Sequence, residues 1–161
     1  MPRVGFSSTS SIRSKRLAKV TIPKQFLNKP SSDANFATKF DELSAHYANF
    51  YEFYGRQTLA AGIRQLIGFI VNNFPRKKAA ILVEADIPIS IIHGKEDKVI
   101  ELWQGVRLAK LLRGRLYVFK GGGHHLHDMY TEKFCKLLLM NVNKGESKLN
   151  QLEKAEDTSV E

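Results

Sequence analysis

The stretch that decides the fold runs from Ile87 to His125 and reads IPISIIHGKEDKVIELWQGVRLAKLLRGRLYVFKGGGHH. It begins with Ile87–His93, a short and nearly continuous run of apolar, β-branched residues that is typical of a strand covered on both faces. A helical pattern follows from about Glu101–Leu112 and ends near Gly114, a residue type that commonly terminates helices. Arg115–Lys120 is a second short strand. This order of elements predicts a right-handed β-α-β unit with two parallel strands.

Helical patterns flank this unit on both sides. The first has apolar residues at spacings of three and four, on one helix face: Phe36, Phe40, Leu43, Tyr47, Phe50 and Tyr54. The second, closed by Pro75, carries Leu59, Ile63, Leu66, Ile67, Ile70 and Phe74. A last helix from about Asp128 to Val142 is expected to bury Phe134, Leu137, Leu138 and Val142. We interpret all three stripes as buried core.

The chain has 161 residues, of which 43% are hydrophobic, and this composition suits one domain with a core and excludes bulk disorder. Its net charge of +9 is concentrated at the start, because seven basic residues precede the first acid, Asp33, and without them 18 basic residues face 16 acidic ones. We therefore expect a disordered basic arm over residues 1–33, a partial α/β domain over 34–142 and a disordered polar tail over 143–161.

Composition also argues against several classes of protein. Beyond residue 33 the chain lacks the basic face with interleaved aromatics that nucleic-acid binding requires. No apolar run reaches the ~18 residues of a membrane-spanning helix. The single cysteine, Cys135, which we expect to be buried on the last helix, excludes a disulfide framework and suits a reducing compartment. We expect a cytoplasmic location, with a mitochondrial one as the alternative because the first 20 residues are acid-free and rich in Ser and Arg.

Two polar side chains follow the ends of the two predicted strands. Asp97 comes after the first strand, and His124 comes after the second, behind three glycines. Reactive groups collect at the carboxyl ends of parallel strands, so we expect these side chains to meet. The carboxylate then fixes the tautomer of the imidazole and leaves its other nitrogen for proton transfer. The alternative is that Asp97 is only a turn or helix-capping carboxylate.

Other histidines lie close to this pair. His93 precedes the turn that carries Asp97, and we interpret it as a packing or turn residue. His125, His127 and Asp128 follow His124 in a spacing that suggests metal ligands. Three ligands within one loop rarely reach good coordination geometry together, so we expect no metal site.

The segment resembles the carboxyl-terminal part of α/β-hydrolase-fold enzymes, over roughly residues 17–142. An apolar strand leading to an HG-x-x-D turn and a later strand leading to a G-H turn carry the likeness, and Gly62–Leu66 resembles the helix before the acid strand in esterase- and lipase-like members. The resemblance implies that Asp97 is the catalytic acid and His124 the general base. It also implies cap-forming helices between Phe36 and Phe74, hydrolysis of a carboxylic ester of a small acylated substrate, and no cofactor.

The chain departs from this family in its nucleophile. The family's serine lies in a G-x-S-x-G elbow upstream of the acid. The only partial match to this motif, Gly5–Thr9, has threonine where the second glycine belongs, and the oxyanion-hole loop is missing as well. We therefore expect a truncated serine-hydrolase-like protein that keeps Asp97 and His124, lacks the nucleophile and is inactive alone. The alternative is a non-catalytic interaction module, or relic, that associates through an exposed sheet edge.

Overall fold

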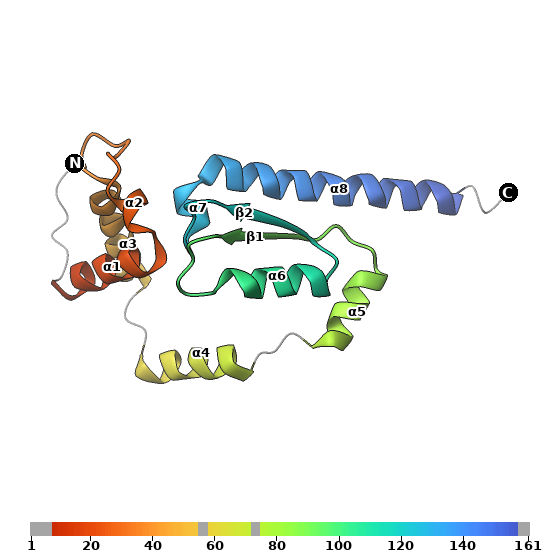
Figure 1. Cartoon of the computed structure of the whole chain (residues 1–161), viewed down its shortest axis with the longest axis horizontal. Coiled ribbons are helices and arrows are strands. Elements are labelled where there is room, and N and C mark those ends of the chain that lie inside the picture. The colour runs from red at the N-terminus through yellow and green to blue at the C-terminus, as the bar shows by residue number, and fades with distance from the viewer. Residues whose placement is uncertain (1–7, 55–57, 72–74, 158–161) are drawn as a thin grey trace.

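The structure, a computed structural model, describes residues 8–54, 58–71 and 75–157 and is a mixed α/β protein with two parallel strands (Figure 1). The elements in chain order are α1 (Ser8–Thr21), α2 (Lys24–Leu27), α3 (Lys39–Tyr54), α4 (Leu59–Val71), α5 (Arg76–Glu84), β1 (Ser90–Gly94), α6 (Leu102–Leu111), β2 (Arg115–Phe119), α7 (Leu126–Met129) and α8 (Thr131–Asp157).

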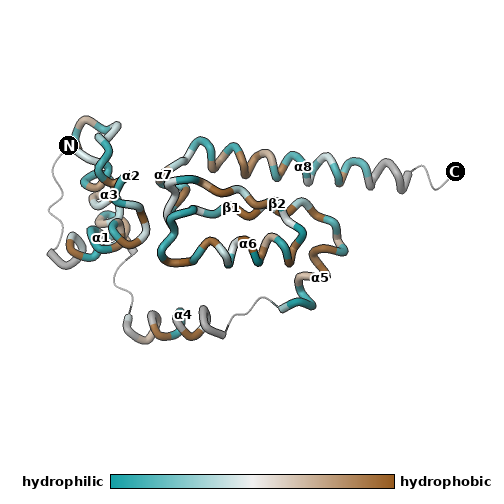
Figure 2. The backbone as a smooth tube through the Cα atoms, in the orientation of Figure 1, coloured by the Kyte–Doolittle hydropathy of each residue, from teal (hydrophilic) through white to brown (hydrophobic). Residues whose placement is uncertain are grey.

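The two strands form a parallel pair between two helices. The register aligns Ser90 with Arg115 and Gly94 with Phe119, and this confirms the predicted parallel arrangement. On one face His93 lies against Gly105 of α6, and on the other the hydroxyl of Ser90 is 2.6 Å from the side-chain oxygen of Asn141 on α8. Figure 2 shows the apolar strands between these two helices. A continuous apolar strand suits this position because both of its faces are covered.

The main hydrophobic cluster lies beside the carboxyl ends of the strands, among α1, α2, α3 and α7. Its buried members are Ala18, Ile22, Phe26, Leu27, Leu43, Tyr47 and Met129. Four of these belong to the arm that we expected to be disordered, so that expectation is wrong for the helical part of residues 1–33. The apolar residues between the basic ones gain enough burial to order α1 and α2, while the charged side chains stay in water.

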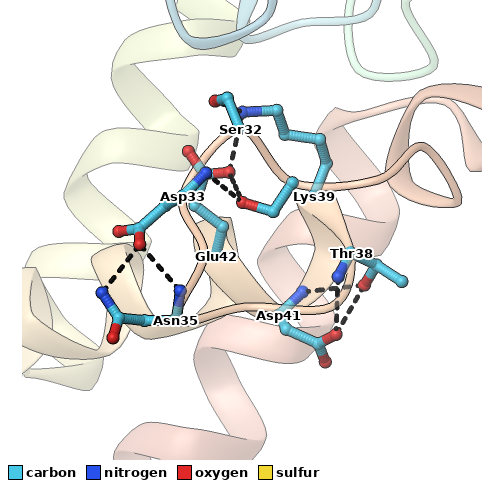
Figure 3. Close-up of polar contacts among 8 residues, drawn as sticks. Ser32, Asp33, Asn35, Thr38, Lys39, Asp41 and Glu42 are labelled. Carbon is cyan, nitrogen blue, oxygen red and sulfur yellow. Dashed lines mark hydrogen bonds and ion pairs between the residues drawn. The ribbon is translucent and has the colours of Figure 1, made fainter.

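The entry into α3 is held by a reciprocal cap (Figure 3). The hydroxyl of Thr38 lies 2.6 Å from Oδ2 of Asp41 and accepts a hydrogen bond from the backbone N–H of Asp41 at 3.3 Å. The same carboxylate accepts the N–H of Thr38 at 3.2 Å, which completes a capping box. Lys39 pairs with Glu42 at 2.7 Å, and Glu42 also accepts a hydrogen bond from Ser31. These contacts fix the direction of α3, which carries Tyr47.

The last helix is longer and less buried than the sequence suggested. α8 has 27 residues and continues to Asp157, so the expected disordered tail is helical over most of its length. A helix of this length spans about 40 Å, whereas the five-residue strands beside it are only about 17 Å long. Figure 1 shows α8 extending beyond the sheet. Leu138 and Val142, expected to be buried, are 47% and 54% exposed, and Cys135 is exposed too.

The helices between α3 and β1 also differ from expectation. Pro75 does not only close a helix but stands immediately before α5, which the sequence analysis missed. Ile63 and Ile67 of α4 are 48% and 54% exposed, so the expected buried stripe is not formed at these two positions. Phe74 lies outside the described residues. Among the helices described, none has the length and apolar character needed to span a membrane.

Candidate functional site

The structure brings Asp97 and His124 together. Nδ1 of His124 is 2.9 Å from Oδ2 of Asp97, and the Asp97 side chain is only 6% exposed. Because an ionised carboxylate only accepts hydrogen bonds, His124 donates Nδ1–H and its Nε2 carries the lone pair. Within the described residues, no serine, threonine or cysteine side chain is hydrogen-bonded to His124. Its ring is 31% exposed, and Nε2 is therefore available to an incoming proton donor.

The carboxylate of Asp97 is held from its other side by its own turn. Oδ1 accepts the backbone N–H of Val99 at 2.8 Å and that of Ile100 at 3.0 Å. Burial acts to raise the pKa of Asp97, but the hydrogen bonds from Ile100, His124 and Val99 outweigh burial and hold the pKa below its ordinary value. The group is therefore ionised and oriented at neutral pH. This environment suits a carboxylate that holds an imidazole in one tautomer.

The two strand-end loops meet through glycine backbones. A Cβ on Gly94 would lie 2.3 Å from the carbonyl oxygen of Gly123 and 2.4 Å from that of Gly122. The N–H of Glu96 donates to the carbonyl of Gly122 at 2.8 Å, which ties the acid loop to the histidine loop. No residue other than glycine fits at position 94 without displacing this backbone. The close approach that brings Asp97 to His124 therefore depends on the HG and GGGH segments together.

The amino-terminal helices hold the histidine loop from outside the sheet. The backbone N–H of His124 donates to the carbonyl of Thr21, at the end of α1, at 2.7 Å. A Cβ on Gly123 would lie 2.4 Å from that same carbonyl oxygen. The sequence does not point to Thr21 as a site residue, because a backbone contact between distant segments leaves no side-chain pattern. The segment that looked like a free arm thus positions His124.

A second polar cluster lies next to the first, around the following residue, His125. The hydroxyl of Tyr47 donates to Oδ2 of Asp128 at 2.6 Å and accepts Nδ1–H of His125 at 2.7 Å. Burial first, and the hydrogen bond to Asp128 second, raise the pKa of Tyr47 above its ordinary value. For Asp128, burial is outweighed by hydrogen bonds from His125 and Tyr47, and its pKa is lowered. The cluster joins α3 to the histidine loop.

The other histidines of this region lie in different environments. His93 is buried, with Nε2 donating to the carbonyl of Ile100 at 3.0 Å, in keeping with a packing residue. His127 is largely exposed, 3.5 Å from Asp128. Within the ranges described, no three His, Cys, Asp or Glu side chains are grouped in a way that could hold a metal ion. Ser7, the serine of the partial G-x-S-x-G match at Gly5–Thr9, lies outside the described residues.

A cavity of about 470 Å³ opens beside the Asp97–His124 pair. Its apolar wall is formed by Ile91, Ile92, Ile100, Trp103, Leu108 and Leu111. Asp97, His124 and Arg107 also line it, so the Asp97–His124 pair faces an apolar space that also contains a cationic side chain. The arrangement can remove a proton from a hydroxyl and return it, next to an apolar group. No known protein family, curated protein or solved structure matches this chain.

Proposed function

We propose that Asp97 and His124 are the acid–base pair of a serine hydrolase that acts on carboxylic esters, and that the chain corresponds to the carboxyl-terminal part of an α/β-hydrolase fold. The observation that carries the proposal is the 2.9 Å contact between Nδ1 of His124 and Oδ2 of Asp97. The second carboxylate oxygen is already occupied by two backbone N–H groups, so Asp97 is held in one orientation. Its Oδ2 lies 2.9 Å from Nδ1 of His124 and 3.9 Å from Nε2 of His93, so His124 is its hydrogen-bonded imidazole.

The pair is suited to transfer a proton in two directions. Nε2 of His124 accepts the proton of an attacking hydroxyl, and Asp97 stays ionised and stabilises the imidazolium. The imidazolium then returns the proton to the departing alcohol of the ester. The apolar wall beside the pair favours an acylated substrate with little charge near the bond that breaks.

The pair needs a nucleophile from outside the contacts described. None of the hydrogen bonds of His124 in the described ranges involves a hydroxyl or thiol group. Loss of the nucleophile costs a serine hydrolase several orders of magnitude in rate. We therefore expect the purified chain to hydrolyse p-nitrophenyl acetate no faster than its His124→Ala variant. Faster hydrolysis that phenylmethylsulfonyl fluoride abolishes would show that a serine of this chain completes the site.

The acid–base pair itself is tested by the reactivity of Nε2. Diethyl pyrocarbonate attacks the lone pair of a neutral imidazole, and mass spectrometry locates the modified histidine. We expect His124 to react faster in the wild-type chain than in the Asp97→Asn variant by about tenfold, because the carboxylate favours the reactive tautomer. The exposed His127 is the internal control and reacts equally in both chains. Equal rates at His124 would remove the support for an acid–base pair.

A second candidate function is that of a non-catalytic interaction module. The observation that favours it is the number of large apolar side chains left in water on α8, where Leu139 is 62% and Leu149 is 57% exposed. Apolar surface of this kind commonly marks a binding site for another protein. Analytical ultracentrifugation tests this candidate, because self-association through this face of α8 would persist after His124→Ala and weaken after Leu139→Ser. A chain that stays monomeric at all concentrations would remove its support.

A further inference from the structure

The side of α1 that faces water is strongly basic. Ser14, Ala18 and Thr21 are buried, so this side of the helix packs inward. Residues two positions apart in a helix lie on nearly opposite sides, and the opposite side of α1 is therefore turned outward. It consists of six exposed residues, which we call the basic face of α1: Ile12, Arg13, Lys15, Arg16, Lys19 and Val20.

The positive charge of this face is not neutralised by the described part of the chain. The ion pairs of lysine side chains found there belong to α3 and α8, and none includes a residue of α1. Lys19 lies 5.4 Å from the centre of the Phe40 ring, a contact that leaves its charge in place. The acids of α3, against which α1 packs, have partners of their own: Asp41 with Thr38, Glu42 with Lys39 and Glu52 with Ser10.

The charge is also confined to this end of the molecule. Beyond residue 33 the chain has 18 basic residues and 16 acidic ones, which nearly balance. Figure 1 shows α1 at the end of the molecule away from the carboxyl terminus. An anionic partner is therefore attracted to the basic face of α1 and not to the chain as a whole.

Two apolar side chains stand among these charges. Ile12 is 53% and Val20 is 56% exposed, and Arg16 lies midway between them on the same side of the helix. Aliphatic side chains beside cationic ones leave water when they enter the boundary between lipid headgroups and acyl chains. A nucleic-acid backbone offers no such apolar layer, and single strands bind to aromatic rings, which this face lacks. The mixture of side chains favours a membrane surface.

The rest of the fold limits how deeply α1 can enter such a surface. Its inward side contributes Ala18 to the hydrophobic cluster, so that side is not free to face lipid. Only Ile12 and Val20 are left to reach the acyl boundary, about 12 Å apart along the helix axis. A basic patch with so few apolar side chains binds reversibly, and salt weakens the binding by screening its charges.

We propose that the basic face of α1 docks the chain on an anionic membrane surface. The arginine and lysine side chains lie among the lipid phosphates and carboxylates, and Ile12 and Val20 reach the acyl boundary. This inference goes beyond the proposed function and does not depend on it, because the face contains neither member of the acid–base pair.

The test uses the full chain and lipid vesicles that are sedimented by centrifugation. Vesicles of equal parts phosphatidylserine and phosphatidylcholine should bind the chain at least tenfold more tightly than vesicles of phosphatidylcholine alone. A rise in NaCl from about 0.1 M to about 0.5 M should remove most of this difference, because the charges are then screened over a shorter distance. Both measurements use the wild-type chain and do not depend on the folding of a variant.

Charge variants locate the binding on α1. Arg13→Glu together with Arg16→Glu should weaken binding to the anionic vesicles at least tenfold, since each basic side chain near such a surface contributes about fivefold. The matched control is Lys77→Glu together with Lys78→Glu, at two exposed positions of α5. It changes the net charge by the same amount and should stay within threefold of wild type.

The apolar side chains separate a membrane from other anionic partners. Ile12→Gln together with Val20→Gln keeps every charge, and glutamine has a higher helix propensity than either residue, so α1 stays folded. We expect this variant to lose at least fivefold in binding to the anionic vesicles. Its binding to poly-uridylate, a single-stranded RNA, should equal that of the wild-type chain. Circular dichroism and urea unfolding check that each variant is folded.

Several results would overturn the proposal. These are equal binding to the two kinds of vesicle, or equal losses in the charge variants of α1 and α5. Unchanged vesicle binding after Ile12→Gln with Val20→Gln, together with tighter binding to poly-uridylate, would assign the face to a nucleic acid. A wild-type dimer in ultracentrifugation that Arg13→Glu with Arg16→Glu converts to monomer would assign it to a second copy. None of these measurements involves His124, so this proposal and the proposed function fail separately.

Discussion

Two neighbouring histidines of one loop lie in two different polar regions. His124 donates Nδ1–H to Asp97 and keeps Nε2 beside an open cavity. His125 donates Nδ1–H to the hydroxyl of Tyr47, which in turn donates to Asp128. Both regions pair an imidazole with an ionised carboxylate. In the first region one imidazole nitrogen is left without a hydrogen bond to the described residues, beside the cavity, whereas the second region joins two parts of the fold. Chemical type alone therefore does not separate a reactive pair from a structural one.

The largest effect is expected from Gly94→Ala, which acts on the His124 region alone. The added Cβ would lie 2.3 Å from the carbonyl oxygen of Gly123, a backbone atom that cannot move away cheaply. We expect a loss of about 3 kcal/mol in the free energy of unfolding, measured with urea. Gly68→Ala is the matched control, because no atom lies within 4 Å of its Cβ and α4 gains helix propensity. Equal stability of the Gly94 variant and wild type would contradict the close approach of the loops.

The next effect is that of Asp97→Asn, which removes the charge but keeps the shape. Hydrogen bonds to a charged group are worth about 2 kcal/mol, and the variant should lose about that much at pH 7. Because the folded-state pKa of Asp97 lies below its ordinary value of 3.8, its contribution is complete above that value and is lost as the pH falls through the folded-state pKa. Urea unfolding at several pH values should show the difference between the two proteins shrinking below about pH 4. A difference that is constant down to pH 2 would contradict the ionised pair.

The smallest effect is expected from Tyr47→Phe, which acts on the His125 region alone. The variant loses the bridging hydroxyl between His125 and Asp128, and we expect a cost of about 1.5 kcal/mol in unfolding free energy. The ¹⁵N shifts of His124 should keep the pattern of the Nδ1–H tautomer, because Asp97 is untouched. Tyr51→Phe is the control, since no hydrogen bond of its hydroxyl is found in the described part of the chain and its stability should change little. A changed tautomer at His124 would show that the two regions are one network.

Much of the sheet and of the first polar region followed from sequence alone. A continuous β-branched run such as Ile87–His93 has few alternatives to a buried strand, and the helix between the strands requires them to run parallel. Asp97 and His124 then fall at the same edge without any knowledge of packing. The strands and the helix between them are predicted from local patterns, and one topological rule then gives their arrangement. Such predictions agree with the structure because they depend on residues that are close together along the chain.

The amino-terminal helices, the Tyr47 cluster and the exposed face of α8 were decided by tertiary structure. The many basic residues of the first 33 positions predicted disorder, despite apolar residues such as Ala18 and Ile22. Burial of these apolar residues against α3 orders the segment. Tyr47 looked like one more apolar position on a helix face until α7 brought Asp128 to its hydroxyl. Leu138 looked buried because an apolar stripe predicts a covered face, and the stripe does not say how far the covering sheet extends. Patterns along the chain indicate for which groups burial or pairing is favourable. Only the packed structure determines which partners lie near enough to bury or pair them.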